Sequence, residues 1–553
     1  MKTSAATLLL ATLLSPIATT AQMTMSKPAH DDRPVLLVPG LGNSHHTIHT
    51  SNPEAQKYFT QGLDYIYAFN HEEARRSFQK AADLDPRAAM PLWGVALAVG
   101  PNYNDIDIGH TREQAAVTAI TRAKKLAASG PAAERDYIQT LSQRYAADSK
   151  HDLHVQGLRY SKGMAALVKK YPDDLDTATL YAESLMDLNP WKLWSADGKP
   201  APGTELIVAT LQGVLHRDPN HIGANHFLIH AVEASPNPDL ALASADRLNT
   251  LAPAAGHLVH MPAHIYQRVG NFDGSATANA NAIVADQAYF TSQHIDLAGE
   301  MYYDMYYVHN IHFLASACSM EGNAACTEKA AAQLAEHVTP AFQKDKQVEW
   351  FLPTQPWMLV RFAQWDKILA TPFPPADMTV LTAMWHYARG CAYVGQHNLS
   401  EARQERTKLS EAKAKLDPKA IPDFNNSADS VYTLALTALD ARILEADGQL
   451  PQAITAWQKA VTLLDTFAYN EPSDWYYPIR ESLGGALLRN DQPVEAEAVF
   501  RRDLKQNPGS GRSLYGLWQS LAMQHRDADA TLVKAQFDAA WSHATITLHI
   551  SAL

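Results

Sequence analysis

The sequence predicts an all-α fold, a right-handed superhelical solenoid of antiparallel helix pairs. A helix, a tight turn, a second amphipathic helix and a proline stop recur along the chain, as in residues 53–86. Two of the stops, Pro219 and Pro253, are separated by one period of the tetratricopeptide repeat (TPR). One helix pair cannot bury its apolar face alone, so neighbouring pairs must stack. No alternating strand pattern of useful length competes.

Length and charge limit the classes of function. The chain has 553 residues, of which 46% are hydrophobic and 19% charged, and this is enough for an extended superhelix. Its 46 basic and 58 acidic residues give a formal net charge of −12. Because phosphate binding needs a basic surface, we expect no nucleic-acid partner.

The first 21 residues have the pattern of a secretory signal peptide. Lys2 precedes an apolar run, and the small residues Thr19 and Ala21 mark a cleavage site after Ala21. We therefore expect a secreted or periplasmic protein. No later segment approaches the ~20 apolar residues of a membrane helix, so no transmembrane segment is expected.

Composition divides the rest of the chain into five parts. Prolines, glycines and three histidines (His45, His46 and His49) before the first helix predict an extended arm, and prolines with aromatics mark a later connection. The predicted parts are an N-terminal arm (22–52), N-terminal TPR-like helices (53–200), histidine-rich TPR repeats with a metal site (201–345), a proline- and aromatic-rich connection (346–380) and C-terminal TPR repeats (381–553).

Two pairs of histidines recur at the repeat period. His226 and His230 are four residues apart, as are His260 and His264, and each histidine of the second pair follows its counterpart by one TPR period. Residues four apart lie on one helical face. One repeat period therefore places the second pair beside the first, and we expect the four rings to converge on one cavity.

Three further histidines extend this cluster. His309 and His312 follow after an insertion, and His257 precedes Pro262 with an undefined direction. Imidazole binds copper, zinc, iron and nickel. The cluster predicts a site for one or two transition-metal ions, with copper favoured and iron or zinc as alternatives. Its predicted ligands are His226, His230, His257, His260, His264, His309 and His312.

Three residues near the histidines are candidate catalytic groups. Glu233 lies three positions after His230 and could be a ligand, an acceptor that orients a ring, or a general base. Tyr303 and Tyr307 share a helical face and could carry electrons or protons beside a redox metal. Ordinary aromatic packing is the alternative for both tyrosines.

Other interpretations of these residues stay open. The histidines could form a polar network in the core or a metal-free catalytic or ligand pocket. Among the three cysteines, Cys318 and Cys326 could pair and leave Cys391 free, or all three could be buried thiols.

The sequence resembles a family of exported bacterial TPR proteins over most of residues 45–330. The matching segments include Asn-His-Phe-Leu-Ile-His-Ala-Val-Glu at 225–233 and His-Met-Pro-Ala-His at 260–264. The full matching segments are residues 51–62, 68–74, 223–236, 256–266 and 309–314. The resemblance implies the helical-repeat fold and brings no particular reaction.

Two functions fit this sequence. The first is a metal-dependent enzyme, with a copper or iron oxidoreductase ahead of a zinc hydrolase, because Cu(II) has the highest affinity in the divalent series. The second is a non-catalytic TPR scaffold or metal carrier that binds a peptide or another protein. In either case a small-molecule or peptide ligand is expected in the concave groove.

Overall fold

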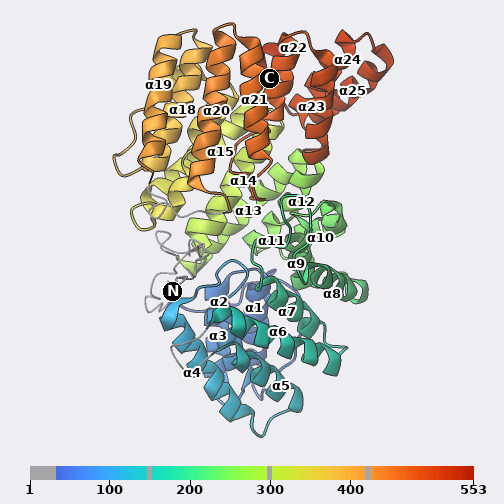
Figure 1. The fold of residues 1–553 in the computed structure, drawn as a ribbon. Coiled ribbons are helices and arrows are strands. Elements are labelled where there is room, and N and C mark those ends of the chain that lie inside the picture. Colours follow the sequence, from blue (N-terminus) through green and yellow to red (C-terminus); the bar gives the residue numbers. More distant parts are fainter. Residues whose placement is uncertain (1–32, 146–151, 296–301, 417–424) are drawn as a thin grey trace, which may run out of the picture.

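The computed structural model describes residues 33–145, 152–295, 302–416 and 425–553. Helices make up about 70% of this part of the chain, which contains two isolated β-bridges and no strand. Figure 1 shows the helices stacked from the N-terminal pairs at one end to the C-terminal pairs at the other. The predicted all-α helical-repeat fold is confirmed, whereas the handedness of the superhelix stays a prediction. The predicted signal peptide lies outside the described residues.

The N-terminal half contains the helices up to residue 293. Its first part consists of α1 (Pro53–Tyr67), α2 (His71–Leu84), α3 (Met90–Val99), α4 (Gly109–Ala127), α5 (Ala132–Leu141), the 3-10 helix η1 (Ser142–Arg144), α6 (Leu153–Lys170) and α7 (Leu175–Met186). Its second part consists of α8 (Thr204–Arg217), α9 (Ile222–Val232), η2 (Pro238–Ala241), α10 (Leu242–Leu251), α11 (Gly256–His260), α12 (Pro262–Val269) and α13 (Phe272–Gln293).

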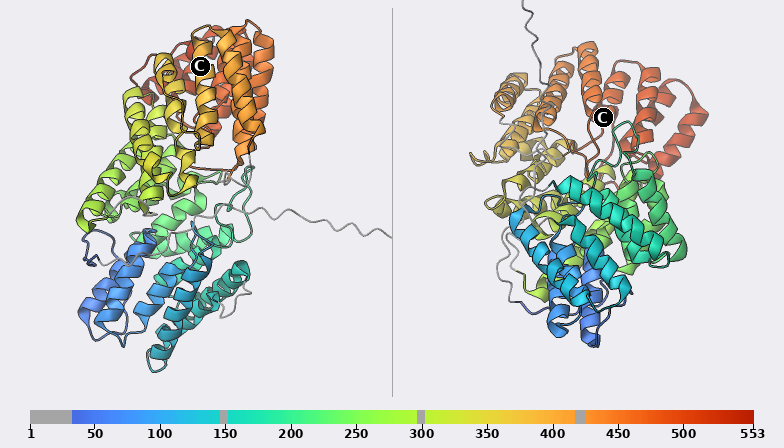
Figure 2. Two further views of the ribbon diagram at one scale, coloured as in Figure 1. Left: turned by 90° about the vertical axis from the view of Figure 1, so that its left-hand side faces the viewer. Right: turned by 60° about the horizontal axis from the view of Figure 1, so that its bottom comes forward.

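The C-terminal half begins with a π-helical turn, η3 (Tyr302–Tyr307). It continues with α14 (Val308–Met320), α15 (Ala324–Ala341), η4 (Lys346–Phe351), α16 (Thr354–Arg361), α17 (Trp365–Ala370), α18 (Thr379–Gly395), α19 (Leu399–Ala414) and α20 (Ala428–Ala446). It ends with α21 (Leu450–Leu464), α22 (Arg480–Arg489), α23 (Pro493–Gln506), α24 (Gly511–Met523), α25 (Asp527–Ala540) and η5 (Ile550–Ala552). Two further views show the same stacking (Figure 2).

The turns between paired helices repeat one backbone conformation. A residue with positive φ follows the first helix of the pair, as at Ala363 (53°), His397 (59°), Asp491 (57°) and His525 (57°). Ala363 and His397 are one TPR period apart, and so are Asp491 and His525. The TPR period is therefore present in the turns as well as in the spacing of the histidines.

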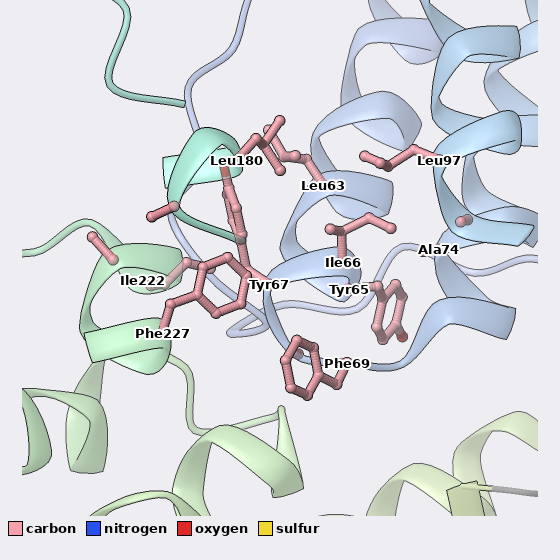
Figure 3. Close-up of a cluster of buried hydrophobic side chains, with 14 of the residues drawn as sticks. Leu63, Tyr65, Ile66, Tyr67, Phe69, Ala74, Leu97, Leu180, Ile222 and Phe227 are labelled. Atoms are coloured by element: carbon pink, nitrogen blue, oxygen red, sulfur yellow. The ribbon is translucent and has the colours of Figure 1, made fainter. Parts of the chain in front are cut away.

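Each half of the chain has its own large apolar core. One contains buried residues from Leu41 to Tyr266, and the other contains buried residues from Ala315 to Val533. In the first, the end of α1 and the following turn meet α9, where Tyr67 and Phe69 lie close to Phe227 (Figure 3). This junction positions one side of the histidine cluster.

The described part of the predicted arm, residues 33–52, contains no helix and lies along α1. Gln61 fixes it at one point, because its side chain accepts from Val38 N at 2.8 Å and donates to Leu36 O at 2.9 Å. His46 is held at another point, with its Nδ1 3.2 Å from Asp176 Oδ2. Side-chain hydrogen bonds therefore hold the arm against both α1 and α7.

The predicted connection at 346–380 contains the helices η4, α16 and α17. Its prolines are compatible with helices because proline is tolerated in the first turn, where its missing N–H costs no hydrogen bond. Pro353 is the residue immediately before α16, and Pro356 lies in the first turn of that helix. The segment therefore contributes a helix pair to the stack.

Cys318 and Cys326 form a disulfide that joins α14 to α15, and Cys391 is a buried free thiol. None of the described helices combines the length and the apolar character needed to cross a membrane.

Candidate metal centre

Six of the seven predicted histidine ligands form two neighbouring sets of three. In each set, one possible ligand atom per residue lies within 4.8 Å of the others. The first set consists of His226 and His230 on α9 and His257 on α11, and the second consists of His260 on α11, His264 on α12 and His309 on α14.

The two sets are in direct contact with each other. The ring centroids of His257 and His260 are 5.9 Å apart, and those of His230 and His264 are 5.5 Å apart. The chain brings them together because α11 ends at His260 and α12 begins at Pro262. The two sets divide within α11, where His257 belongs to the first set and His260 to the second, and His264 on α12 joins His260.

In four of the six rings, Nδ1 is hydrogen-bonded to an oxygen atom on the side away from the other histidines, and this contact orients the ring. His226 Nδ1 lies 2.6 Å from Tyr67 O, and His260 Nδ1 lies 2.6 Å from Asn279 Oδ1. His230 Nδ1 and His264 Nδ1 lie 2.8 and 2.5 Å from the two carboxylate oxygens of Glu233. Each Nδ1 therefore donates outward and each Nε2 faces inward, where the Nε2 of a neutral ring carries a lone pair.

The inward nitrogen atoms either pair with one another or have no partner among the described residues. The Nε2 atoms of His226 and His257 face each other at 3.1 Å, and those of His260 and His264 face each other at 2.6 Å. His230 Nε2 and His257 Nδ1 are buried with no partner in the described part of the chain. Neutral imidazole nitrogen atoms in this arrangement could bind an electron-pair acceptor such as a metal ion.

Burial keeps most of the imidazoles neutral, which is the protonation state that binds metal. His309 is partly exposed, and the other five rings are buried. Burial, reinforced by neighbouring histidines, holds the pKa values of His226, His257, His260 and His309 well below the usual range. Burial also disfavours the charged form of His264, but Glu471 and Glu233 outweigh it and raise the pKa of that ring to about 10.

Glu233 occupies the position of an orienting acceptor. Burial alone would raise its pKa, but His230 and His264 outweigh that effect and hold the pKa well below its usual range. Both carboxylate oxygens are engaged by rings of different sets. Of the three predicted roles for Glu233, this geometry favours orientation of the rings.

A second carboxylate, Glu471, reaches the site from the segment between α21 and α22. Its Oε2 lies 2.8 Å from His264 Nδ1 and accepts a hydrogen bond from Tyr469 at 2.7 Å. Its side chain is 3% exposed. Sequence reasoning missed Glu471 because it lies outside the histidine-rich repeats and belongs to no periodic pattern.

One phenylalanine lies against each set. Phe69 contacts the three rings of the first set at centroid distances of 4.5, 5.6 and 5.5 Å, and Phe313 contacts those of the second at 5.2, 5.2 and 5.4 Å. Phe69 has a φ of 55°, which is uncommon for a bulky residue. The turn after α1 thus places the apolar ring of Phe69 against the first set.

Tyr303 and Tyr307 lie on the face of η3 that points away from the histidine sets. Tyr303 is hydrogen-bonded to His337 at 2.5 Å, and Tyr307 accepts from Gln287 at 3.0 Å. Tyr302 and Tyr306, on the other face of this turn, approach the histidine sets instead. The ring of Tyr306 is 4.8 Å from that of His257, and Tyr302 accepts from His257 N at 3.1 Å.

His312 belongs to neither set. Its ring packs against Phe351 at a centroid distance of 5.4 Å, and burial lowers its pKa to about 4. His309 and His312 are three positions apart on α14, and only His309 faces the second set.

A smaller group of His46, Asp174 and Asp176 lies where the arm meets α7. Asp176 Oδ1 accepts from Tyr67 at 2.5 Å and lies 3.3 Å from His221 Nε2. Tyr67 is also the residue whose carbonyl oxygen faces His226. The group therefore supports the first set by fixing Tyr67.

No protein-family model matches the sequence, and neither does any curated protein. Among solved structures, a human IFIT1 dimer with m7Gppp-AAAA is 12% identical with a TM-score of 0.34, over 90% of this chain and 92% of that chain. The APC/C hetero-tetramer Cut9–Hcn1 is 10% identical with a TM-score of 0.31, over 86% and 78%. The P58(IPK) TPR domain is 10% identical with a TM-score of 0.22, over 86% and 99%. These values support no inference about a ligand or a reaction.

Proposed function

We propose that the chain binds two transition-metal ions, one in each three-histidine set. The observation that carries the proposal is the orientation of the rings. Four Nδ1 atoms are hydrogen-bonded to oxygen atoms on the outer side of the site, while the Nε2 atoms face one another or lack a partner. A metal-bound histidine normally donates its other ring N–H to a carboxylate, a carbonyl oxygen or water, and these rings follow that pattern.

The donor set favours copper. Imidazole nitrogen suits copper, zinc, iron and nickel, and copper has the highest affinity in the divalent series. Three protein ligands per ion leave a coordination position for a substrate, as in catalytic rather than closed structural sites. Two adjacent redox ions would supply electrons or oxidising equivalents for the reaction of a small molecule or dioxygen.

Burial favours a resident cofactor over a transported one. A metal carrier must release its ion, whereas here His226 and His260 are 0% exposed and His264 is 1% exposed. The partly exposed His309 marks the side from which a small molecule would approach. These features support a metal-dependent oxidoreductase as the function of the histidine-rich repeats, with a zinc hydrolase as the alternative.

Export to an oxidising compartment is part of the same proposal. The Cys318–Cys326 disulfide supports it, because such bonds form and persist mainly in oxidising compartments. The N-terminal sequence pattern of residues 1–21 supports it independently.

The test compares metal content and oxygen consumption in the full chain and in two variants. Protein produced in an oxidising compartment and dialysed should retain copper or iron. His230→Ala and His264→Ala should lose metal from one set each while the helical circular dichroism is kept, because solenoid stability is spread over many interfaces.

An oxygen-consumption screen with small organic reductants then separates the two kinds of enzyme. Metal-dependent consumption supports the oxidoreductase. Zinc as the bound metal would reject it, because zinc has no accessible second oxidation state. Wild-type metal content in both variants would reject the ligand assignment itself.

A further inference from the structure

The connection between α21 and α22, residues 465–479 and here called the strap, is long and contains no helix. It joins Leu464 at the end of α21 to Arg480 at the start of α22. The next connection between pairs is much shorter and runs from Gln506 at the end of α23 to Gly511 at the start of α24. A long connection without secondary structure is uncommon in a compact fold and usually has a function.

The C-terminal end of the strap is anchored on α16 and α18. The ring of Trp475, which is 2% exposed, lies 5.7 Å from that of Trp357 on α16 and 5.3 Å from that of Tyr387 on α18. Tyr476 stacks on Trp357 at 5.5 Å, and its hydroxyl is hydrogen-bonded to that of Tyr387 at 3.0 Å. Aromatic pairs of this kind stabilise a contact beyond the area that they bury.

Asn426, just before α20, holds the strap at two other points. Its Oδ1 accepts from Ala468 N at 2.8 Å, and its Nδ2 donates to Ala468 O at 2.9 Å. The same Nδ2 also donates to Asp474 Oδ2 at 2.6 Å. Ala468 and Asp474 lie on either side of Glu471 in the sequence. One amide side chain therefore closes the loop that carries this carboxylate.

The middle of the strap reaches the N-terminal half at α12. Glu471 Oε2 lies 2.8 Å from His264 Nδ1 and accepts from the hydroxyl of Tyr469 at 2.7 Å. The guanidinium carbon of Arg268, one turn after His264, lies 5.4 Å from the ring centroid of Tyr469. Two residues of the strap thus contact α12, and one of the contacts is with a histidine of the second set.

Apolar packing between the halves would not require a carboxylate at this contact. Glu471 is 3% exposed, and it shares His264 Nδ1 with a second buried carboxylate, Glu233. Burying charged groups costs free energy, and apolar side chains of similar volume often serve as well or better. A local feature that costs stability is expected where the side chain acts on a functional site.

We propose that the strap, held by Asn426 and Trp475, positions Glu471 against His264, so that docking of the strap and metal binding in the second set stabilise each other. The inference rests on the proposed function. An outer carboxylate orients a metal-bound ring and raises its basicity. If the docked strap raises the metal affinity by some factor, bound metal favours docking by the same factor.

This coupling gives the C-terminal repeats a role in the metal centre. The pairs from α16 onward supply none of the six histidines of the two sets. They contact the site through the strap, whose position depends on α16, α18 and the residue before α20.

The experiment measures two quantities in the full chain, with copper(II) as the metal. The first is amide hydrogen exchange in peptides that cover the strap, without metal and at saturating copper. The second is the copper affinity of each set, from competition with a chelator. We expect copper to slow exchange in the strap, because a ligand that prefers the docked state suppresses local opening. Peptides from α25 are the internal reference and should not change.

Asn426→Asp should weaken copper binding in the second set about tenfold, the lower end of the range for loss of such an outer partner. The new carboxylate would face that of Asp474, and like charges repel. The double variant Asn426→Asp/Asp474→Asn restores an amide–carboxylate pair and should recover most of the affinity. A merely structural role predicts no such recovery. Trp475→Leu should weaken the same set by loss of the aromatic anchor. Asn490→Asp, at a residue that donates to Gln492 outside the strap, is the matched control and should bind copper like the wild type.

Three outcomes would overturn the proposal while leaving the metal centre in place. They are strap exchange that does not respond to copper, wild-type affinity in Asn426→Asp, and a double variant no better than that single one. A wild type that binds no copper would instead overturn the proposed copper site, and the coupling with it. If Trp475→Leu loses its helical circular dichroism, the exchange between Asn426 and Asp474 decides the question, because both side chains are partly exposed.

Discussion

Glu233 is hydrogen-bonded to His230 and His264 at once, through different oxygen atoms, at 2.8 and 2.5 Å. The two rings belong to different three-histidine sets and to different helices. One buried, ionised carboxylate therefore orients a ring in each set. Such acceptors also raise the basicity of the ring they contact, so both sets depend on this side chain.

Glu233→Gln should weaken metal binding in both sets. The amide cannot accept from both rings through two anionic oxygens, and loss of such an acceptor typically costs 10–100-fold in metal affinity. Competition with a chelator measures the affinity. Glu54→Gln, at an exposed residue on α1, is the control and should behave like the wild type. Unchanged affinity in Glu233→Gln would show that the two rings need no such support.

Glu471→Gln should weaken metal binding more in the second set than in the first. Among the six histidines, Glu471 contacts His264, and it also interacts with Glu233, which orients a ring in each set. Partial chelation followed by metal analysis should show one strongly weakened and one slightly weakened ion per chain. Equal weakening of both ions would mean that Glu471 acts on the whole site, and no weakening would mean that Glu233 suffices.

Gly223→Ala should destabilise the protein by about 1–3 kcal/mol, the usual cost of overpacking a core. A Cβ at this position on α9 would lie 2.4 Å from the buried ring of Tyr67. Gly213→Ala on α8 is the matched control, because a Cβ there meets nothing within 4 Å, and it should stabilise the helix by up to about 1 kcal/mol. Denaturant unfolding measures both. A Gly223→Ala variant as stable as Gly213→Ala would contradict the close approach of α1 and α9.

The buried Asp503 should make stability fall between about pH 4 and about pH 7. Burial, with a contribution from Glu481, raises the pKa of Asp503 to about 7. In this range the folded protein holds a proton that the unfolded chain has released, so stability decreases as pH rises. Asp503→Asn cannot titrate and should lose stability less steeply. Asp538→Asn, at an exposed residue of α25, should match the wild-type slope, and identical slopes in all three proteins would refute the assigned pKa direction.

Sequence periodicity predicted that His226, His230, His260 and His264 lie close together in one cavity, and the structure places them close together but in two sets. The same offset of one TPR period separates His226 from His260 and His230 from His264, and it placed four rings together without any knowledge of contacts. Such an inference works in a solenoid because each repeat contacts its neighbours in sequence order.

The division into two sets could not be predicted from that spacing. The division falls within α11, where His257 faces α9 and His260, three residues later, faces α14. Tyr303 and Tyr307 do share a face of η3, but their spacing alone could not show that Tyr302 and Tyr306, on the other face, are the pair that approaches the histidines. Glu471 comes from a later loop, and only the three-dimensional path of the chain brings it to His264.

The most direct test of the metal centre is the number of ions per chain. Metal analysis of dialysed wild-type protein should give close to two transition-metal ions. The double variant His260→Ala/His309→Ala, which leaves the first set intact, should give close to one ion with its helical circular dichroism unchanged. Background metal in the wild type, or equal metal in both proteins, would contradict the assignment of one ion to each three-histidine set.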